Sequence, residues 1–383
     1  MREGSCSGAR AGYARVVLVS WLILTLQPIA HARSDLQRDW PRTDFSNALI
    51  DLDAVRSGGP PKDGIPAIDE PRFEQFETAE RWLGDREPVI ALSAGDEARA
   101  YPLQIMIWHE IVNDTVGDVP VSVTYCPLCN SAVSYRREVR GVETTFGTSG
   151  SLFSSALVMY DRATETLWTH FDGRAVVGLL AGDVLEPIPS PLLSWDEFRS
   201  TYPDGLVLDP AATGFSRRYG SNPYQGYDDP ESFPFLFRGV PDNRALAKQR
   251  VVGVSHNDEA AAYSLDLIAG GEAQATNVSL GGDGLAIFWV AGQATALESG
   301  TISEGRDVGS VSVFRAALDG QSLTFSADTD GFTDDQTGSR WLLNGEAVDG
   351  PLAGSRLERI NHLDTFWFAW ATYQPETALV ESS

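Results

Sequence analysis

Thr124-Tyr125-Cys126-Pro127-Leu128-Cys129-Asn130 follows a mostly apolar run, Val119 to Val123, that indicates a buried strand. β-branched and aromatic residues return directly afterwards, in residues 132–135. The cysteine pairs of thioredoxin-like proteins open a helix instead, and the helix N-terminus lowers the pKa of the thiol. We therefore expect Cys126 and Cys129 to lie on a knuckle between two strands.

The segments around this knuckle predict strands joined by tight turns. The run from Leu103 to Val112 has apolar residues at helical spacing and carries His109 and Glu110, so it predicts a short helix. Strands are expected at 89–92, 98–101, 132–135, 142–146 and 157–160. The predicted fold class is α+β, predominantly β, with short helices.

The second part of the chain repeats patterns of the first. Asp161-x-x-Thr164-x-x-x-Trp168 returns as Asp334-x-x-Thr337-x-x-x-Trp341, and residues 173–185 match residues 345–357 at eight of 13 positions. Such self-similarity predicts two tandem repeats of a β-rich unit. The predicted order is an N-terminal extension at 33–88, a first repeat at 89–210, a linker at 211–250 and a second, degenerate repeat at 251–383.

Residues that return in both repeats are best interpreted as scaffold, whereas residues present once are candidates for function. When the strand before the cysteines is aligned with residues 285–289, Cys126 aligns with Val290 and Cys129 aligns with Gln293. His109 and His170 likewise have no histidine counterpart. The first repeat is therefore predicted to carry the chemistry.

The first 32 residues have the form of a secretory signal, with arginines before an apolar segment and a small-x-small cleavage site at 30–32. Their removal takes away three arginines and one glutamate, so the net charge of −24 becomes −26. Nucleic acid and anionic membranes attract basic proteins, and both are excluded as expected partners. A periplasmic or secreted protein without a stable membrane anchor is predicted.

Several segments together resemble a known family. They are 101–105, 107–114, the Thr124-to-Asn130 stretch, 146–150, 157–162 and 366–370. They are similar to the uncharacterised prokaryotic proteins catalogued as domain of unknown function 3179. The resemblance spans nearly all of the mature chain and implies no particular reaction.

Three interpretations of the cysteine pair stay open. Exported cysteines commonly form disulfides, although so short a ring gives little stabilisation. Thiol–disulfide exchange with a periplasmic redox partner is the second interpretation. The first choice from sequence is soft-metal binding, with copper or zinc as the cofactor and a metal-delivering partner. The runner-up from another class is a non-catalytic binding or scaffold protein with a structural disulfide.

A metal site would need ligands beyond the two sulfurs. The predicted ligand set is Cys126, Cys129, His109, Met159 and His170. A lone histidine is often a hydrogen-bonded core residue, and a methionine in an apolar strand normally packs in the core. No hydrolase motif competes, because the residues around Ser149 lack the Gly-x-Ser-x-Gly elbow. Whether the protein is an enzyme is left open by the sequence.

Overall fold

The computed structural model describes residues 39–329 and 331–382, and these residues form mostly β-structure. Strands hold 41% of the chain and helices 11%, which confirms the predicted predominantly β fold with short helices. No helix within the described ranges is long and apolar enough to cross a membrane. The predicted signal segment lies outside the described residues.

The first half of the chain builds three sheets around the cysteine strand. The central sheet has the order β14-β7-β6-β5, and its neighbours have the orders β15-β3-β4-β16-β2 and β1-β10-β11-β12-β13. The elements are η1 (Leu52–Ala54), β1 (Val55–Ser57), β2 (Phe73–Glu74), α2 (Phe76–Ala79), β3 (Pro88–Ala94), β4 (Glu97–Pro102), α3 (Leu103–His109), β5 (Ile111–Val116), β6 (Val119–Cys126), β7 (Ser131–Arg136), β8 (Glu138–Val139), β9 (Val142–Glu143), β10 (Phe146–Phe153), β11 (Ala156–Asp161), β12 (Leu167–Thr169), β13 (Ala175–Val177), β14 (Pro187–Ile188), β15 (Leu192–Ser194), α4 (Trp195–Thr201), β16 (Leu206–Leu208) and η2 (Pro210–Ala212).

The second half largely repeats the order of elements that starts at β3 in the first half, without a counterpart of β14. Its larger sheets have the orders β28-β17-β18-β29, β19-β20-β21 and β24-β25-β26-β27. The elements are β17 (Arg250–His256), β18 (Glu259–Ser264), α5 (Leu265–Ile268), β19 (Ala273–Leu280), β20 (Asp283–Val290), η3 (Ile302–Glu304), β21 (Ser310–Arg315), β22 (Ala317–Leu318), β23 (Gln321–Ser322), β24 (Phe325–Asp328), β25 (Gly331–Asp334), β26 (Arg340–Trp341), β27 (Ala347–Asp349), β28 (His362–Phe366), α6 (Trp367–Tyr373) and β29 (Ala378–Val380).

Strand pairings also recur between the halves. β15 pairs antiparallel with β3 while β16 runs parallel to β4. In the second half, β28 pairs antiparallel with β17 while β29 runs parallel to β18. A duplicated unit would produce this recurrence, and the predicted repeat boundaries stay a prediction.

The repeated Asp-x-x-Thr-x-x-x-Trp pattern forms the same turn twice. Asp161 accepts hydrogen bonds from the backbone N–H of Thr164 at 2.6 Å and from the indole N–H of Trp168 at 3.1 Å. Asp334 accepts the equivalent bonds from Thr337 at 2.6 Å and from Trp341 at 3.0 Å. These side chains satisfy buried backbone donors, which is a scaffold role.

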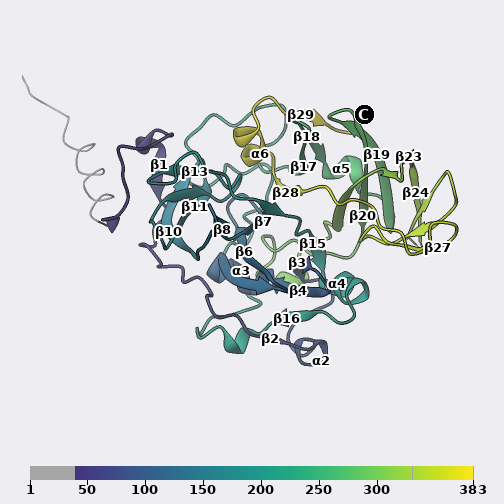
Figure 1. Cartoon of the computed structure of the whole chain (residues 1–383), viewed down its shortest axis with the longest axis horizontal. Helices are drawn as coiled ribbons and strands as arrows, with labels where there is room; N and C mark the ends of the chain where they lie inside the picture. The colour runs from purple at the N-terminus through teal and green to yellow at the C-terminus, as the bar shows by residue number, and fades with distance from the viewer. Residues whose placement is uncertain (1–38, 330, 383) are drawn as a thin grey trace, which may run out of the picture.

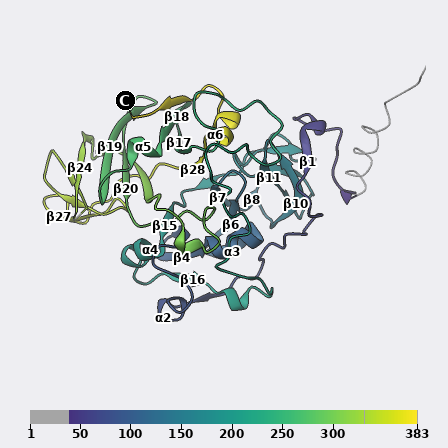
Figure 2. The same cartoon turned by 180° about the vertical axis from the view of Figure 1, so that it is seen from behind.

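The two halves share a hydrophobic core. The cluster that contains Cys126 and Cys129 also contains the second-half residues 366–371. In Figure 1 and in the reverse view of Figure 2, β28 runs back from the second half toward β7 beside the first-half sheets. The cysteine knuckle is therefore enclosed by both halves.

The N-terminal extension lies on the first half. β1 pairs with β10 and β2 pairs with β16, so the extension supplies edge strands. Lys62 contacts Glu165 at 2.8 Å and lies over the rings of Trp40 and Tyr160. Its ammonium group thus fastens the extension to β11.

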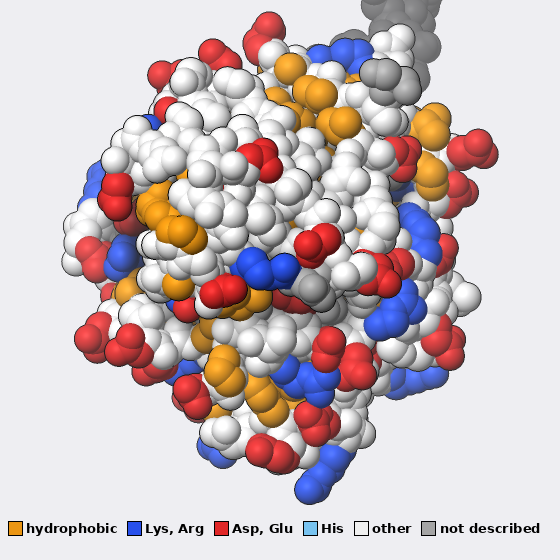
Figure 3. Space-filling model, turned by 90° about the vertical axis from the view of Figure 1, so that its right-hand side faces the viewer, with side chains coloured by type: hydrophobic (Ala, Val, Ile, Leu, Met, Phe, Trp, Pro, Cys, Tyr) orange, Lys and Arg blue, Asp and Glu red, His pale blue; other side chains and the backbone are white. Residues whose placement is uncertain are grey.

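Acidic and basic side chains lie next to each other on the face of the second half in Figure 3. Ion pairs in the second half include Arg356 with Glu346 at 2.6 Å and Arg340 with Asp328 at 3.4 Å. The acidic excess is therefore dispersed on this face.

Candidate dithiol site

The cysteine knuckle is a tight connection between β6 and β7. Cys126 ends β6 and pairs with Ser131, the first residue of β7. Asn130 closes the turn with a positive φ of 48° and donates its N–H to the carbonyl of Pro127 at 3.2 Å. No helix begins here, as the residues after Cys129 predicted.

Both cysteines are free thiols and are almost fully enclosed. Cys126 is 1% exposed and Cys129 is 0% exposed. The second half closes one side, because the carbonyl of Cys129 accepts hydrogen bonds from the Thr365 hydroxyl at 2.7 Å and the Phe366 N–H at 3.2 Å. The β28 strand therefore fixes the backbone of the knuckle.

The two thiols have opposite pKa shifts. Burial acts to raise the pKa of Cys126, but hydrogen bonds from the Cys129 thiol and from backbone N–H groups, including that of Leu157, bring it below its ordinary value. Burial and the adjacent Cys126 sulfur raise the pKa of Cys129 well above its ordinary value. One proton shared by two close thiols explains this asymmetry, because two adjacent negative charges are unfavourable.

Ser131, His170 and Thr124 extend a chain of hydrogen bonds from Cys129. The Ser131 hydroxyl lies 3.0 Å from the Cys129 sulfur and 2.8 Å from His170 Nε2. His170 Nδ1 lies 2.8 Å from the Thr124 hydroxyl, which donates its single proton to the carbonyl of Val133 at 2.6 Å. Nδ1 must therefore carry the ring proton, so Nε2 accepts from Ser131.

These hydrogen bonds orient the Cys129 thiol, and His170 does not act as a general base that removes its proton. Burial lowers the pKa of His170 to about 3, whereas that of Cys129 lies above its ordinary value of 9.0. Moving the proton from Cys129 to His170 is therefore strongly unfavourable. The neutral imidazole instead holds Ser131 against the sulfur.

His109 belongs to a different network. Its Nδ1 lies 2.8 Å from the carbonyl of Pro66, and its Nε2 lies 2.8 Å from the hydroxyl of Tyr219. Burial lowers the pKa of His109. Both ring nitrogens are thus engaged outside the cysteine pair.

Met159 lies on β11, where it is fully buried and pairs with Thr148 and Trp168. Of the predicted ligands, the structure links His170 to Cys129 through Ser131 and places Met159 in the surrounding core. Within residues 39–329 and 331–382, no three His, Cys, Asp or Glu side chains are grouped as a metal site. The copper or zinc interpretation of Cys126, Cys129, His109, Met159 and His170 stays a prediction.

Glu110 is a site residue that was not predicted from the sequence, where it was noted only as the neighbour of His109. It ends α3 with a positive φ of 59°, is 8% exposed, and its carbonyl accepts the N–H of Tyr125 at 2.8 Å. Burial and the charge of Cys126 raise the pKa of its carboxyl well above the ordinary value. The Glu110 carboxyl and the Cys126 thiol therefore influence each other's ionisation.

The predicted linker covers the knuckle. The Tyr227 hydroxyl donates to the carbonyl of Leu128 at 2.9 Å, and Lys248 donates to the backbone carbonyl of Tyr227. Burial raises the pKa of Tyr224 and Tyr227, and the nearby Cys126 charge adds to this. Sequence reasoning treated residues 211–250 as a connection, because a cover without regular structure carries no periodic signal.

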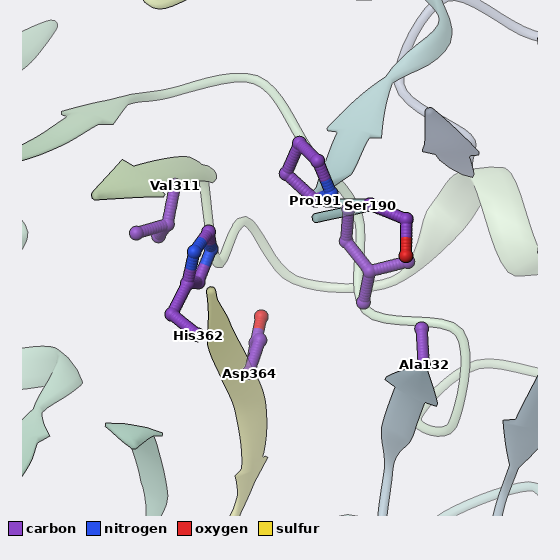
Figure 4. A pocket seen from close by; sticks show the side chains of 7 residues that line it. Ala132, Ser190, Pro191, Val311, His362 and Asp364 are labelled. Atoms are coloured by element: carbon purple, nitrogen blue, oxygen red, sulfur yellow. The ribbon is translucent and has the colours of Figure 1, made fainter. Parts of the chain in front are cut away.

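The remaining histidines of the described residues, His256 and His362, lie in the second half. His256 contacts Asp283 at 2.8 Å. Burial and the charge of Arg359 lower the pKa of His362 to about 4. Figure 4 shows His362 beside a cavity of about 10 Å³ between the halves, which has room for a single water. This cavity is too small for a substrate.

Comparison with known proteins places the chain in one family. Residues 62–377 match the family model described as "Protein of unknown function (DUF3179)", which covers both halves and the cysteine knuckle. No curated protein and no solved structure matches the chain. The chain therefore belongs to the DUF3179 family of proteins of unknown function.

Proposed function

We propose that this protein carries out thiol–disulfide exchange, with Cys126 as the attacking thiol and Cys129 as the resolving thiol. The observation that carries this proposal is the pair of opposite pKa shifts in adjacent free thiols. A thiolate is the nucleophile in disulfide exchange, and a lowered pKa makes it available near neutral pH. The predicted export to the periplasm or the exterior would place the pair among disulfide-bearing proteins.

The exchange proceeds in two displacement steps. The Cys126 thiolate attacks one sulfur of the partner disulfide, forms a mixed disulfide and releases the first partner thiolate. Cys129 gives its proton to that thiolate and attacks the Cys126 sulfur, which forms the Cys126–Cys129 disulfide and releases the second thiolate. The second released thiolate takes its proton from solvent. Two electrons pass to the partner disulfide, which becomes two thiols.

The contacts of the histidines favour exchange over metal binding. His109 and His170 use both ring nitrogens in hydrogen bonds within the protein, so metal binding would require breaking those bonds. Two sulfurs alone still suit a soft ion such as copper(I). Metal analysis of the reduced protein after exposure to copper(I) or zinc separates the two functions.

The test is to trap the mixed disulfide. We expect Cys129→Ser to accumulate a covalent adduct with an aromatic disulfide, because the resolving thiol is absent, and mass spectrometry would place it on Cys126. The matched control Cys126→Ser should form no adduct. One bound equivalent of metal that Cys126→Ser abolishes, together with no adduct in Cys129→Ser, would favour the metal site instead.

A further inference from the structure

The peptide group between Leu128 and Cys129 links the cysteine pair to a tyrosine far away in the sequence. Its N–H belongs to Cys129 and donates a hydrogen bond to the Cys126 sulfur. Its carbonyl belongs to Leu128 and accepts a hydrogen bond from the Tyr227 hydroxyl at 2.9 Å. The N–H and the C=O of a trans peptide group lie in one plane and point in opposite directions. A bond that fixes this carbonyl therefore also fixes the direction of the N–H.

The Tyr227 hydroxyl belongs to a series of hydrogen bonds that all donate toward the Cys126 sulfur. The N–H of Phe235 donates to the Tyr227 hydroxyl at 3.3 Å, and this hydroxyl donates to the carbonyl of Leu128. Across the peptide group, the N–H of Cys129 donates to the sulfur. Hydrogen bonds in series polarise one another, so each earlier donor strengthens the last bond. The series thus directs partial positive charge at the sulfur, which favours the thiolate over the thiol.

Tyr227 lies in the cover, which we define as residues 222–239, and contacts on several sides hold it. Its N–H donates to the carbonyl of Leu297 at 3.0 Å. The Lys248 ammonium group lies 4.2 Å from the centre of the Tyr227 ring and donates to the Tyr227 carbonyl. The ring centroids of Tyr227 and Phe366 are 6.1 Å apart. Because packing fixes this ring, its hydroxyl can hold a peptide group in one orientation.

The next peptide group of the cysteine loop is also fixed, but it faces a different acceptor. The carbonyl of Cys129 accepts a hydrogen bond from the Thr365 hydroxyl at 2.7 Å. The N–H of the same peptide group belongs to Asn130 and donates to the carbonyl of Pro127 at 3.2 Å. The Thr365 bond therefore maintains the shape of the loop, whereas the Tyr227 bond acts on a peptide group that faces the sulfur.

We propose that Tyr227 is a positioning residue for the reaction of Cys126: its hydroxyl holds the Leu128–Cys129 peptide group with the N–H directed at the attacking sulfur. The inference rests on the proposed exchange function and adds a residue of the cover to it. Tyr227 acts through the peptide group and not on the sulfur itself. Because 99 residues separate Tyr227 from Leu128 in the chain, only the folded structure identifies this role.

The test is Tyr227→Phe, which removes the hydroxyl and keeps the ring. The measurement is the pH profile of Cys126 alkylation by iodoacetamide in a Cys129→Ser background, with the adduct assigned to Cys126 by mass spectrometry. Loss of one hydrogen bond from the series should raise the pH at which half of Cys126 is ionised by about half a unit to one unit. A cover that is only looser would raise the alkylation rate at every pH without moving this midpoint.

Two control variants show whether the effect belongs to Tyr227. Tyr373→Phe makes the same chemical change in α6, where the hydroxyl donates to the carbonyl of Phe153 at 3.1 Å, and should leave the midpoint unchanged. Thr365→Val removes the hydroxyl from the Cys129 carbonyl and should also leave it unchanged, because that peptide group directs its N–H at Pro127. An unchanged midpoint in Tyr227→Phe, or an equal rise in Thr365→Val, would overturn the inference.

The midpoint and the exchange rate separate this inference from the proposed function. A midpoint that rises in Tyr227→Phe, without disulfide exchange by the unmodified protein, would retain the positioning role toward the Cys126 thiol and reject the exchange function. Exchange by the unmodified protein, together with the same midpoint in Tyr227→Phe, would retain the exchange function and reject the positioning role.

Discussion

The ends of β6 and β20 have the same strand pairing and different chemistry. Cys126 pairs with Ser131 at the end of β6, and Val290 pairs with Ser310 at the end of β20. In both halves the serine that begins the next strand contacts a side chain in the loop after β6 or β20. Ser131 lies 3.0 Å from the Cys129 sulfur, whereas the Ser310 hydroxyl lies 3.1 Å from the Gln293 side-chain oxygen.

The strand registers extend this comparison to the other site residues. The β11–β12 and β25–β26 pairings align Met159 with Phe332, and counting onward aligns His170 with the buried Leu343. The β5–β6 and β19–β20 hairpins align Glu110 with Gln274. The second half thus keeps the strands but has uncharged or apolar residues at the positions of the site. The strands therefore form without the site residues.

The largest expected effect comes from Cys126→Val, which introduces the second-half residue. Exchange should fall below detection because the nucleophile is gone, while the free energy of unfolding should fall by only about 1–3 kcal/mol, because valine adds one heavy atom to an enclosed site. The rate with an aromatic disulfide and urea unfolding measure the two quantities. Residual exchange at the rate of the unmodified protein would show that Cys126 is not the attacking thiol.

His170→Leu tests the Leu343 position through the pH dependence of stability. Because burial lowers the pKa of His170 to about 3 from 6.5, between these pH values only the unfolded chain gains a proton there, so stability falls as pH falls. From pH 7 to pH 5 this histidine should cost the unmodified protein about 2 kcal/mol, and His170→Leu should lose about that much less. Urea unfolding at both pH values checks this, and an equal loss in both proteins would contradict it.

The smallest effect is expected for Glu110→Gln, which copies Gln274. Because the negative charges of Glu110 and Cys126 repel each other, Cys126 should form its thiolate in two steps more than about one pKa unit apart in a Cys129→Ser background, where no second thiol titrates. Adding Glu110→Gln to that background should leave one step, measured by thiolate absorbance against pH. Glu138→Gln, at an exposed glutamate of β8, is the control. Two steps in Glu110→Gln would remove Glu110 from the site.

The sequence by itself determined the local features of this protein. Alternating and apolar runs predicted the strands on either side of Cys126 and Cys129, because strand burial leaves a periodic signal. The recurrence of Asp161 and Trp168 as Asp334 and Trp341 identified scaffold residues that the turns confirm. Family membership was also visible in the motifs of the chain.

Only the tertiary structure decided which of these features meet. His170 reaches the cysteine loop through Ser131, 39 residues away, while His109 bonds to Tyr219, 110 residues away. Thr365 contacts Cys129 across 236 residues. Spacing along the chain does not encode such contacts, because they depend on how the sheets of the two halves and the cover pack together.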